Sequence, residues 1–296
     1  MKARRFALAL VASLIARPAL AWYKEGHEIV AIIAADNLGP AARSHVAQIL
    51  GMPANKSSIE EAMAAASNRP DNEFREEDRR TAAWHFIDIC MQDKQSELST
   101  RCAGGNCVTA KIDEYAQRLR RRDYDKWGAA GDLAFLIHFV GDIHQPLHAA
   151  NDADRGGICQ AVNVEPAEEN LHYAWDDAVV VNLEQQLGTH APEATARKLE
   201  ALYPERADSF TWQPGTSQQI AWETHELADK DVYGALGIPE RPCEMQTCDP
   251  ATGAAVTMSP AYMKRAGDIA GHQLAKAGYR LAALMNQIWP SAAPPR

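Results

Sequence analysis

Long apolar runs are almost absent from this sequence. Apart from residues 6–16, no stretch approaches the roughly 20 apolar residues that a helix needs to cross a bilayer. A Gly/Ser-rich linker, an internal repeat and a break in composition are also absent. We therefore expect one large domain rather than two small ones, without stable membrane association.

The first 21 residues have the parts of a secretory signal peptide. A basic start is followed by the apolar run and by Ala19-Leu20-Ala21, which is a small-x-small cleavage signal. Cleavage between Ala21 and Trp22 makes Trp22 the first residue of the mature protein. We expect a soluble product that is secreted or periplasmic and whose mature domain spans residues 22–296.

Basic residues are too few to give the protein a positive face. The chain has 30 Lys and Arg against 39 Asp and Glu, and the leader holds four of the basic residues, so the mature charge is −13. This balance excludes the broad basic surface that is typical of nucleic-acid binding. If the substrate is a nucleic acid, its phosphates must meet a local positive charge, for which bound divalent metal is the obvious source.

Cysteines number six, and none has the two-residue spacing of a zinc ribbon. An even number fits disulfides in an oxidising compartment. Two pairs are spaced for small local loops, which leaves the other two cysteines to pair. The expected disulfides are therefore Cys102–Cys107, Cys243–Cys248 and Cys90–Cys159.

Helical periodicity is common in the sequence, whereas alternating strand patterns are scarce. Ser259-Pro260 is an N-cap followed by proline at the first helical position, and leucines then recur with the period of one buried helix face. Further helices are predicted over residues 27–38, 110–121, 132–145, 171–181, 191–202 and 218–229. The remaining Gly-, Pro- and Cys-rich stretches predict ordered loops, so the expected fold is mainly α with long disulfide-stapled loops.

The segment from residue 138 to residue 148 contains the strongest signal for chemistry. His138 and Asp142 are four residues apart on a predicted helix, so both side chains lie on one face and can bind one metal ion. Pro146 disfavours helical geometry at the preceding residue. The helix should therefore end or kink there, which can turn His148 toward a neighbouring metal position.

A second pair of the same design follows, since His172 and Asp176 are also four residues apart. Two His/Asp pairs favour a site with several metal ions, because both residue types are zinc ligands. His85 and Asp71 are further candidates. Alone, each would be read as a core histidine or a turn carboxylate, but a buried carboxylate is costly without a cation, so the candidates support one another.

The new N-terminus at Trp22 is another candidate ligand. A free α-amine has a pKa of about 7.7 to 8.0, so a metal ion can displace its proton near neutral pH. His27 follows five residues later. The alternative is that Trp22 is only the first ordered residue of the core.

Together these elements resemble the trinuclear-zinc single-strand nucleases of the S1/P1 family, within the zinc phospholipase C/nuclease superfamily. The resemblance extends in order along nearly the whole mature chain and rests on four elements: leader-Trp22-x4-His27, Trp-His85-Phe-x-Asp88, His138-x3-Asp142-x5-His148 and His172-x3-Asp176. It implies a single helical domain of the phospholipase C/P1 nuclease type.

The resemblance also implies the ligands of three zinc ions. They would be Asp71, His85, His138 and Asp142 for the first ion, His148, His172 and Asp176 for the second, and Trp22 (amine and carbonyl), His27 and Asp142 for the third. Asp142 would bridge the first and third ions. A metal-bound hydroxide would then attack phosphorus and leave 5′-phosphate products.

Two further residues acquire roles through the resemblance. Phe86 would stack an unpaired base, a contact worth about 1 to 3 kcal/mol, although core packing is the alternative. Asp88 would join Asp142 as a catalytic carboxylate by orienting the nucleophilic water or a substrate group. The implied protein is a monomeric hydrolase of ester bonds, an endonuclease and 3′-nucleotidase acting on single-stranded RNA and DNA and on 3′-nucleotides.

One element departs from the family. Its Gly-Gly-Asn supplies an amide to the substrate, whereas this chain has Gly156-Gly157-Ile158, and isoleucine cannot donate that hydrogen bond. Either Asn151 or Asn163 substitutes, or the bond is absent.

Two other functions remain open. A zinc-dependent phospholipase C belongs to the same superfamily, but the resemblance places its first His farther from the N-terminal Trp and puts Glu where this chain has Asp176. An exported zinc-binding protein without catalysis would have closed sites with four protein ligands. The second site here has three candidates and so an open position, which favours catalysis.

Overall fold

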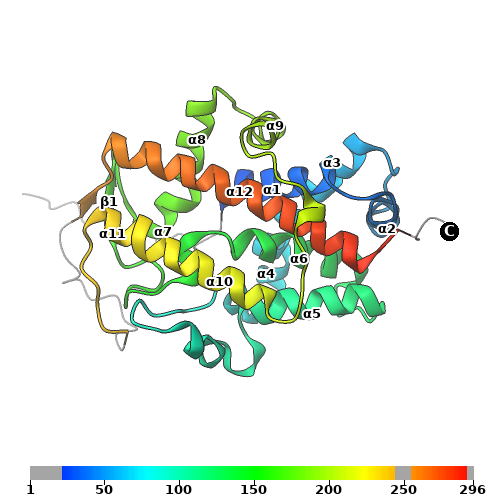
Figure 1. Cartoon of the computed structure of the whole chain (residues 1–296), viewed down its shortest axis with the longest axis horizontal. Coiled ribbons are helices and arrows are strands. Elements are labelled where there is room, and N and C mark those ends of the chain that lie inside the picture. The colour runs from blue at the N-terminus through cyan, green and yellow to red at the C-terminus, as the bar shows by residue number, and fades with distance from the viewer. Residues whose placement is uncertain (1–21, 244–254, 292–296) are drawn as a thin grey trace, which may run out of the picture.

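Helices form most of the computed structural model, which describes residues 22–243 and 255–291 (Figure 1). The expected signal peptide and Cys248 lie outside the described residues. The longer α-helices are α1 (Tyr23–Asp36), α2 (Pro40–Leu50), α3 (Lys56–Ser67), α5 (Val108–Arg121), α6 (Gly128–Asp142), α8 (Val179–Leu187), α9 (Pro192–Leu202), α10 (Thr216–Leu227) and α12 (Pro260–Ile288). The mainly α fold is confirmed.

Shorter elements join these helices and build the walls of the site. Single α turns are α4 (Arg75–Glu77), α7 (Leu171–Tyr173) and α11 (Gly234–Leu236). The 3-10 and π segments are η1 (Pro70–Phe74), η2 (Arg79–His85), η3 (Gln95–Gly105), η4 (Pro146–Ala149), η5 (Ala174–Ala178), η6 (Ala207–Ser209) and η7 (Ala228–Tyr233). Within the described residues, the strands form one small sheet in the order β2 (Ala167–Asn170), β1 (Ala161–Val164), β3 (Val256–Thr257), with β1 antiparallel to β2 and parallel to β3.

The long helix α12 crosses the molecule and packs against α1 and α8 (Figure 1). It begins as predicted, because the Ser259 hydroxyl accepts a hydrogen bond from the backbone N of Tyr262 at 3.2 Å. Gly278 lets α12 approach α1 closely, since a β-carbon there would lie 2.5 Å from Cβ of Ile33. In the described residues, no helix is both long enough and apolar enough to cross a membrane.

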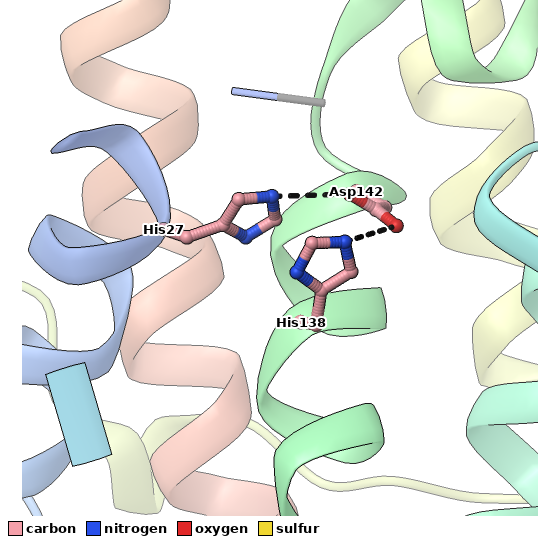
Figure 2. Close-up of side chains that lie close together, drawn as sticks. All are labelled: His27, His138 and Asp142. Atoms are coloured by element: carbon pink, nitrogen blue, oxygen red, sulfur yellow. Dashed lines mark ion pairs between the residues drawn. The ribbon is translucent and has the colours of Figure 1, made fainter. Parts of the chain in front are cut away.

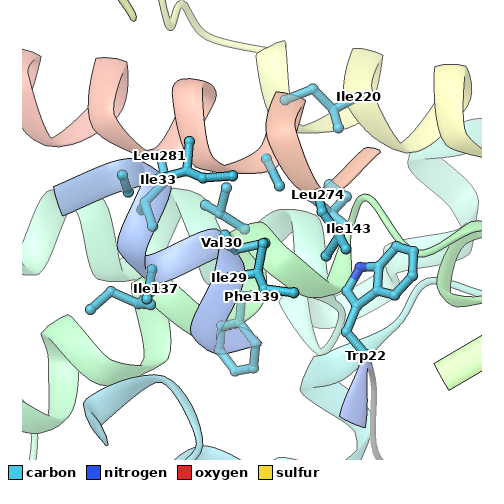
Figure 3. Packing of buried hydrophobic residues seen from close by; sticks show 14 of the residues in the cluster. Trp22, Ile29, Val30, Ile33, Ile137, Phe139, Ile143, Ile220, Leu274 and Leu281 are labelled. Atoms are coloured by element: carbon cyan, nitrogen blue, oxygen red, sulfur yellow. The ribbon is translucent and has the colours of Figure 1, made fainter. Parts of the chain in front are cut away.

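The core lies between α1, α6 and α12. Figure 3 shows the Trp22 side chain at one end of this cluster, close to Ile143 and Leu274. Trp22 is fully buried, and its indole Nε1 donates a hydrogen bond to the carbonyl oxygen of Gly141 at 3.0 Å. Because full burial of a Leu or Ile side chain stabilises by about 1.5 to 3 kcal/mol, this cluster holds α1 and α6 in fixed register.

Several helix boundaries differ from the prediction. Helix α1 begins at Tyr23, and α6 runs from Gly128 to Asp142 rather than over residues 132–145. The predicted helix 171–181 continues to Leu187 through η5 and α8. Helices α2 and α3 were not predicted, because their buried faces rely on alanine and a few larger residues, which gives little contrast between the two faces of each helix.

Two of the expected disulfides are wrong. Cys102–Cys107 forms as predicted, but Cys90 pairs with Cys243 across 153 residues, with a Cα–Cα distance of 5.6 Å. Cys243 is therefore not bonded to Cys248, and Cys90 is not bonded to Cys159. Cys159 is itself disulfide-bonded. Loop spacing failed here because tertiary packing, not distance along the chain, brings Cys90 and Cys243 together.

Candidate metal centre

The site is built around the last turn of α6. His138 and Asp142 are fully buried one turn apart, with Nε2 of His138 3.3 Å from Oδ2 of Asp142. His27 reaches the same carboxylate from α1, with Nε2 3.4 Å from Oδ1 of Asp142 (Figure 2). Gly141 makes room for this approach, because a β-carbon there would lie 2.8 Å from Nδ1 of His27. The His27 ring also stacks on the His138 ring, with centroids 3.8 Å apart.

Asp71 and His85 complete the first group from η1 and η2. Nδ1 of His85 lies 3.0 Å from both Oδ2 of Asp142 and Nε2 of His138. Asp71 is 3.6 Å from each of these two imidazoles. The four residues assigned to the first ion by the resemblance therefore converge on one point.

The second group lies where the chain turns after α6. Helix α6 ends at Asp142, and Gln145 is extended (φ −79°, ψ 121°) before Pro146, so that η4 carries His148 back toward the site. Nε2 of His148 lies 3.2 Å from Nε2 of His172, which lies 3.3 Å from Oδ2 of Asp176. The turn expected from Pro146 is present and brings His148 to the second His/Asp pair.

Trp22 contacts the second group directly. Its backbone N donates a hydrogen bond to Oδ1 of Asp176 at 3.2 Å. In the full chain this nitrogen is a peptide amide. Cleavage before Trp22 would turn it into an amine at the same place, next to the second group.

Backbone carbonyls orient three of the imidazoles. Nδ1 of His138 bonds Ser67 O at 2.7 Å, Nδ1 of His148 bonds His85 O at 2.7 Å, and Nδ1 of His172 bonds Gly156 O at 2.6 Å. Because a carbonyl oxygen only accepts, each Nδ1 carries the proton. Each Nε2 therefore presents its lone pair to the cluster, as a metal ligand must.

Burial disfavours the charged forms of the carboxyl groups and imidazoles in the cluster. It raises the pKa of Asp142 well above its ordinary value, and the carboxylates of Asp71 and Asp176 raise it further. Burial likewise lowers the pKa of His138 well below its ordinary value and that of His172 to about 4. The protein alone therefore favours neutral side chains, whereas a cation would favour the carboxylates.

The unpaired atoms of the cluster fit a metal ion. Oδ1 of Asp142 and Oδ2 of Asp176 are buried and accept no hydrogen bond from a described residue. An unsatisfied buried acceptor costs about 1 to 3 kcal/mol. Three groups have ligand atoms within 4.8 Å of one another and could each hold an ion: His27–His138–Asp142, Asp71–His85–His138 and His148–His172–Asp176. Imidazoles and carboxylates are a donor set that zinc accepts.

A cavity of about 640 Å³ opens onto the cluster and is lined by His85, His148 and His172. Phe86, 37% exposed, and Asp88 also line it, so Phe86 is not a core residue. Ile158 lies on the cavity wall with Asn151, whose amide Nδ2 donates to Oδ1 of Asp88 at 3.3 Å. Of the two asparagines considered as substitutes, Asn151 is thus the one at the cavity.

Sequence reasoning missed the arginines of this cavity, which are Arg75, Arg101 and Arg155. Only Arg75 had a local signal, since it stands four residues after Asp71 and its Nη1 lies 3.4 Å from Oδ1 of Asp71. His144, which matched no ligand position, bonds Val140 O and Arg280 and stays outside the three groups.

Comparison with known proteins agrees with the geometry. A model of the S1/P1 Nuclease family matches residues 22–290, which confirms the resemblance seen in the motifs. Nuclease P1 of Penicillium citrinum is 28% identical over 283 residues, covering 90% of this chain and 97% of that protein. Endonuclease 2 of Arabidopsis thaliana is 28% identical over 280 residues, covering 90% of each. Nuclease S1 of Aspergillus oryzae is 26% identical over 276 residues, covering 90% and 91%.

Proposed function

The chain belongs to the S1/P1 nuclease family and is a nuclease, and on that premise we propose that it is a zinc-dependent endonuclease and 3′-nucleotidase. Its substrates are single-stranded RNA and DNA and 3′-nucleotides, and its products carry 5′-phosphates. It acts as a secreted or periplasmic monomer whose one domain begins at Trp22. A family match that starts at residue 22 and a disulfide-bonded fold support this start and this location.

The observation that carries the proposal is the convergence of three His/Asp groups on one buried cluster at the end of a cavity. Three zinc ions would be held by Asp71, His85, His138 and Asp142, by His148, His172 and Asp176, and by Trp22, His27 and Asp142. When bound, zinc supplies Lewis acidity that polarises phosphoryl oxygens and lowers the pKa of a nearby water.

The residues of the cavity position the substrate for that chemistry. Phe86 offers an exposed ring on which an unpaired base can stack. Duplex DNA has no unpaired base, so this contact favours single strands. Asp88 orients the attacking water or a substrate group, and the Asn151 amide holds its carboxylate in place at 3.3 Å. Asp142 faces His27 with Oδ1 and His85 with Oδ2, an arrangement that suits a carboxylate shared by two groups.

The test uses the correctly processed protein and compares its activity on different substrates. We expect cleavage of single-stranded DNA and RNA well above that of duplex DNA, hydrolysis of 3′-AMP, loss of both activities with a chelator and their recovery with zinc. Release of phosphocholine from lecithin without cleavage of single-stranded DNA would instead identify a phospholipase C. Bound zinc without phosphodiester or 3′-nucleotide hydrolysis across pH 5 to 9 would identify a zinc-binding protein.

A further inference from the structure

Two of the three guanidinium groups that line the cavity are already engaged by carboxylates. Arg75 pairs with Asp71 at 3.4 Å. Arg101 makes two hydrogen bonds to Asp93, from Nε and Nη2, each at 2.5 Å. Neither of these arginines therefore offers an uncompensated charge to a ligand.

Arg155 differs from both. Its side chain is exposed and lines the cavity, and within residues 22–243 and 255–291 its guanidinium has no ion-pair or hydrogen-bond partner. Its charge acts across the cavity on Asp88, where burial raises the carboxyl pKa and the arginines Arg101 and Arg155 oppose that rise. On a chain with a net charge of −9, Arg155 is thus a local positive charge in the cavity that the exposed ring of Phe86 also lines.

The backbone at Arg155 has an unfavourable conformation for a residue with a side chain. Arg155 has φ +60°, in the left-handed region where a β-carbon is unfavourable and glycine is the usual residue. Two bonds fix the loop there. The backbone N of Arg155 donates to Oδ1 of Asn151 at 3.2 Å, and the next carbonyl, Gly156 O, accepts from Nδ1 of His172 at 2.6 Å. The loop that carries Arg155 is therefore tied directly to a residue of the metal cluster.

We propose that Arg155 binds a non-scissile phosphate of the single strand whose base stacks on Phe86. The inference rests on the proposed function. A guanidinium presents a planar fork of donors that matches phosphate, and a side chain free of carboxylate partners keeps those donors available. The anchor to His172 sets the position of this contact relative to the scissile phosphate at the cluster.

A contact between Arg155 and a second phosphate distinguishes oligonucleotides from mononucleotides. A 3′-nucleotide has only the phosphate that is hydrolysed, so it cannot reach Arg155 and the metal cluster with two phosphates at once. An oligonucleotide has neighbouring phosphates and can. Arg155 therefore favours strands over mononucleotides through KM rather than through kcat.

The experiment compares Arg155→Gly with Arg122→Gly in the full mature protein. Arg122 is a matched control, because it is also exposed, also left-handed (φ +58°) and absent from the cavity lining. We expect Arg155→Gly to raise KM for a single-stranded oligonucleotide roughly tenfold at low salt. The plot of log(1/KM) against log[salt] should become flatter by about 0.7, the value for one phosphate contact on a single strand. KM for 3′-AMP should change far less.

The controls exclude a merely structural effect. Neither glycine variant should melt below the wild type, because glycine accepts the left-handed backbone. Arg155→Lys should restore most of the salt dependence because it returns the charge, while KM should recover only in part because lysine lacks the planar fork. If the salt dependence of the Lys variant equalled that of Arg155→Gly, the charge of Arg155 would not contact a phosphate and the proposal would be wrong. An active wild type with an unchanged slope in Arg155→Gly would overturn this inference alone. A wild type that cleaves no nucleic acid would overturn the proposed function and this inference together.

Discussion

Trp22 and Asp176 are hydrogen-bonded across 154 residues of sequence, from the backbone N of Trp22 to Oδ1 of Asp176 at 3.2 Å. Both residues are fully buried. The nitrogen therefore lies against a carboxylate of the His148–His172–Asp176 group. Its chemical state, amide or amine, decides whether it can be a ligand.

We expect a mature protein that retains Met before Trp22 to lose the third zinc ion and most of its activity. An amide nitrogen has no lone pair to offer a metal at neutral pH, whereas the amine does. The fold should survive, because the indole remains packed under Gly141. Zinc content, activity and helical circular dichroism of the two forms measure this. Equal activity in both forms would refute the role of the N-terminus.

The substitution Asp142→Asn should remove more than one zinc ion and lower activity by more than about 100-fold. Loss of a residue that only hydrogen-bonds to a metal ligand already lowers metal affinity or activity by about 10- to 100-fold. Asp142 itself faces four imidazoles. With zinc chelated at pH 8, the variant should melt no lower than the wild type, because a buried carboxylate with a raised pKa disfavours folding once ionised. Asp268→Asn, on the exposed face of α12, is the control. Full zinc content in Asp142→Asn would contradict the bridging role.

Replacing Phe86 by Ala should raise KM for single-stranded DNA by about 5- to 150-fold, which corresponds to the loss of about 1 to 3 kcal/mol of stacking. Phe86→Tyr keeps an aromatic face and should retain KM within a few-fold. Thermal stability should hardly change, because the ring is exposed in the cavity. An unchanged KM in Phe86→Ala would exclude a stacking role.

The stabilisation by zinc should grow with pH. Burial raises the pKa of Asp71 to about 7, so in the metal-free protein its contribution to stability is present below pH 3.8 and is lost as pH rises through about 7. The opposite holds for His172, whose pKa is lowered to about 4; its contribution is present above pH 6.5 and is lost as pH falls through about 4. Zinc needs neutral His172 and ionised Asp71, so binding releases protons from the carboxyl. The difference in Tm between zinc-loaded and chelated protein should widen from pH 5 to pH 8, and a constant difference would contradict this.

The Cys90–Cys243 disulfide should matter more than Cys102–Cys107. Replacing both members of the long-range pair by Ser should lower the free energy of unfolding by about 2 to 4 kcal/mol, because the bond closes a separation of 153 residues. The pair 102–107 closes a separation of 5 residues and restricts the unfolded chain less. Chemical denaturation of the two double variants measures this. An equal loss would show that chain entropy does not explain the effect.

Part of the site could be predicted from local rules on helices and prolines. The His138 and Asp142 side chains share a helix face in any helix, and Pro146 disfavours helical geometry at Gln145. The shared face and the extended Gln145 are confirmed, whereas the helix itself already ends at Asp142. The ordered motifs added the family, and with it residues such as Asp71, whose place beside His138 no local rule gives.

The remaining features depend on contacts between distant segments. Cys243 meets Cys90, and not a near neighbour, because the packed helices bring residue 243 to the rim of the cavity. Arg155 carries no sequence signal at all. It stands out only because carboxylates engage the other two arginines of the cavity, and no carboxylate among the residues that the structure describes engages Arg155. Such differences exist only once the chain is folded.

The carbonyl bonds to His138, His148 and His172 bear on how this chemistry can persist through evolution. Every amino acid supplies the same main-chain oxygen, so the bond to His138 does not restrict the side chain at residue 67 as long as the backbone path is kept. The other two positions are fixed for separate reasons, because His85 is itself a candidate ligand and a β-carbon at Gly156 would lie 2.7 Å from Leu147 O.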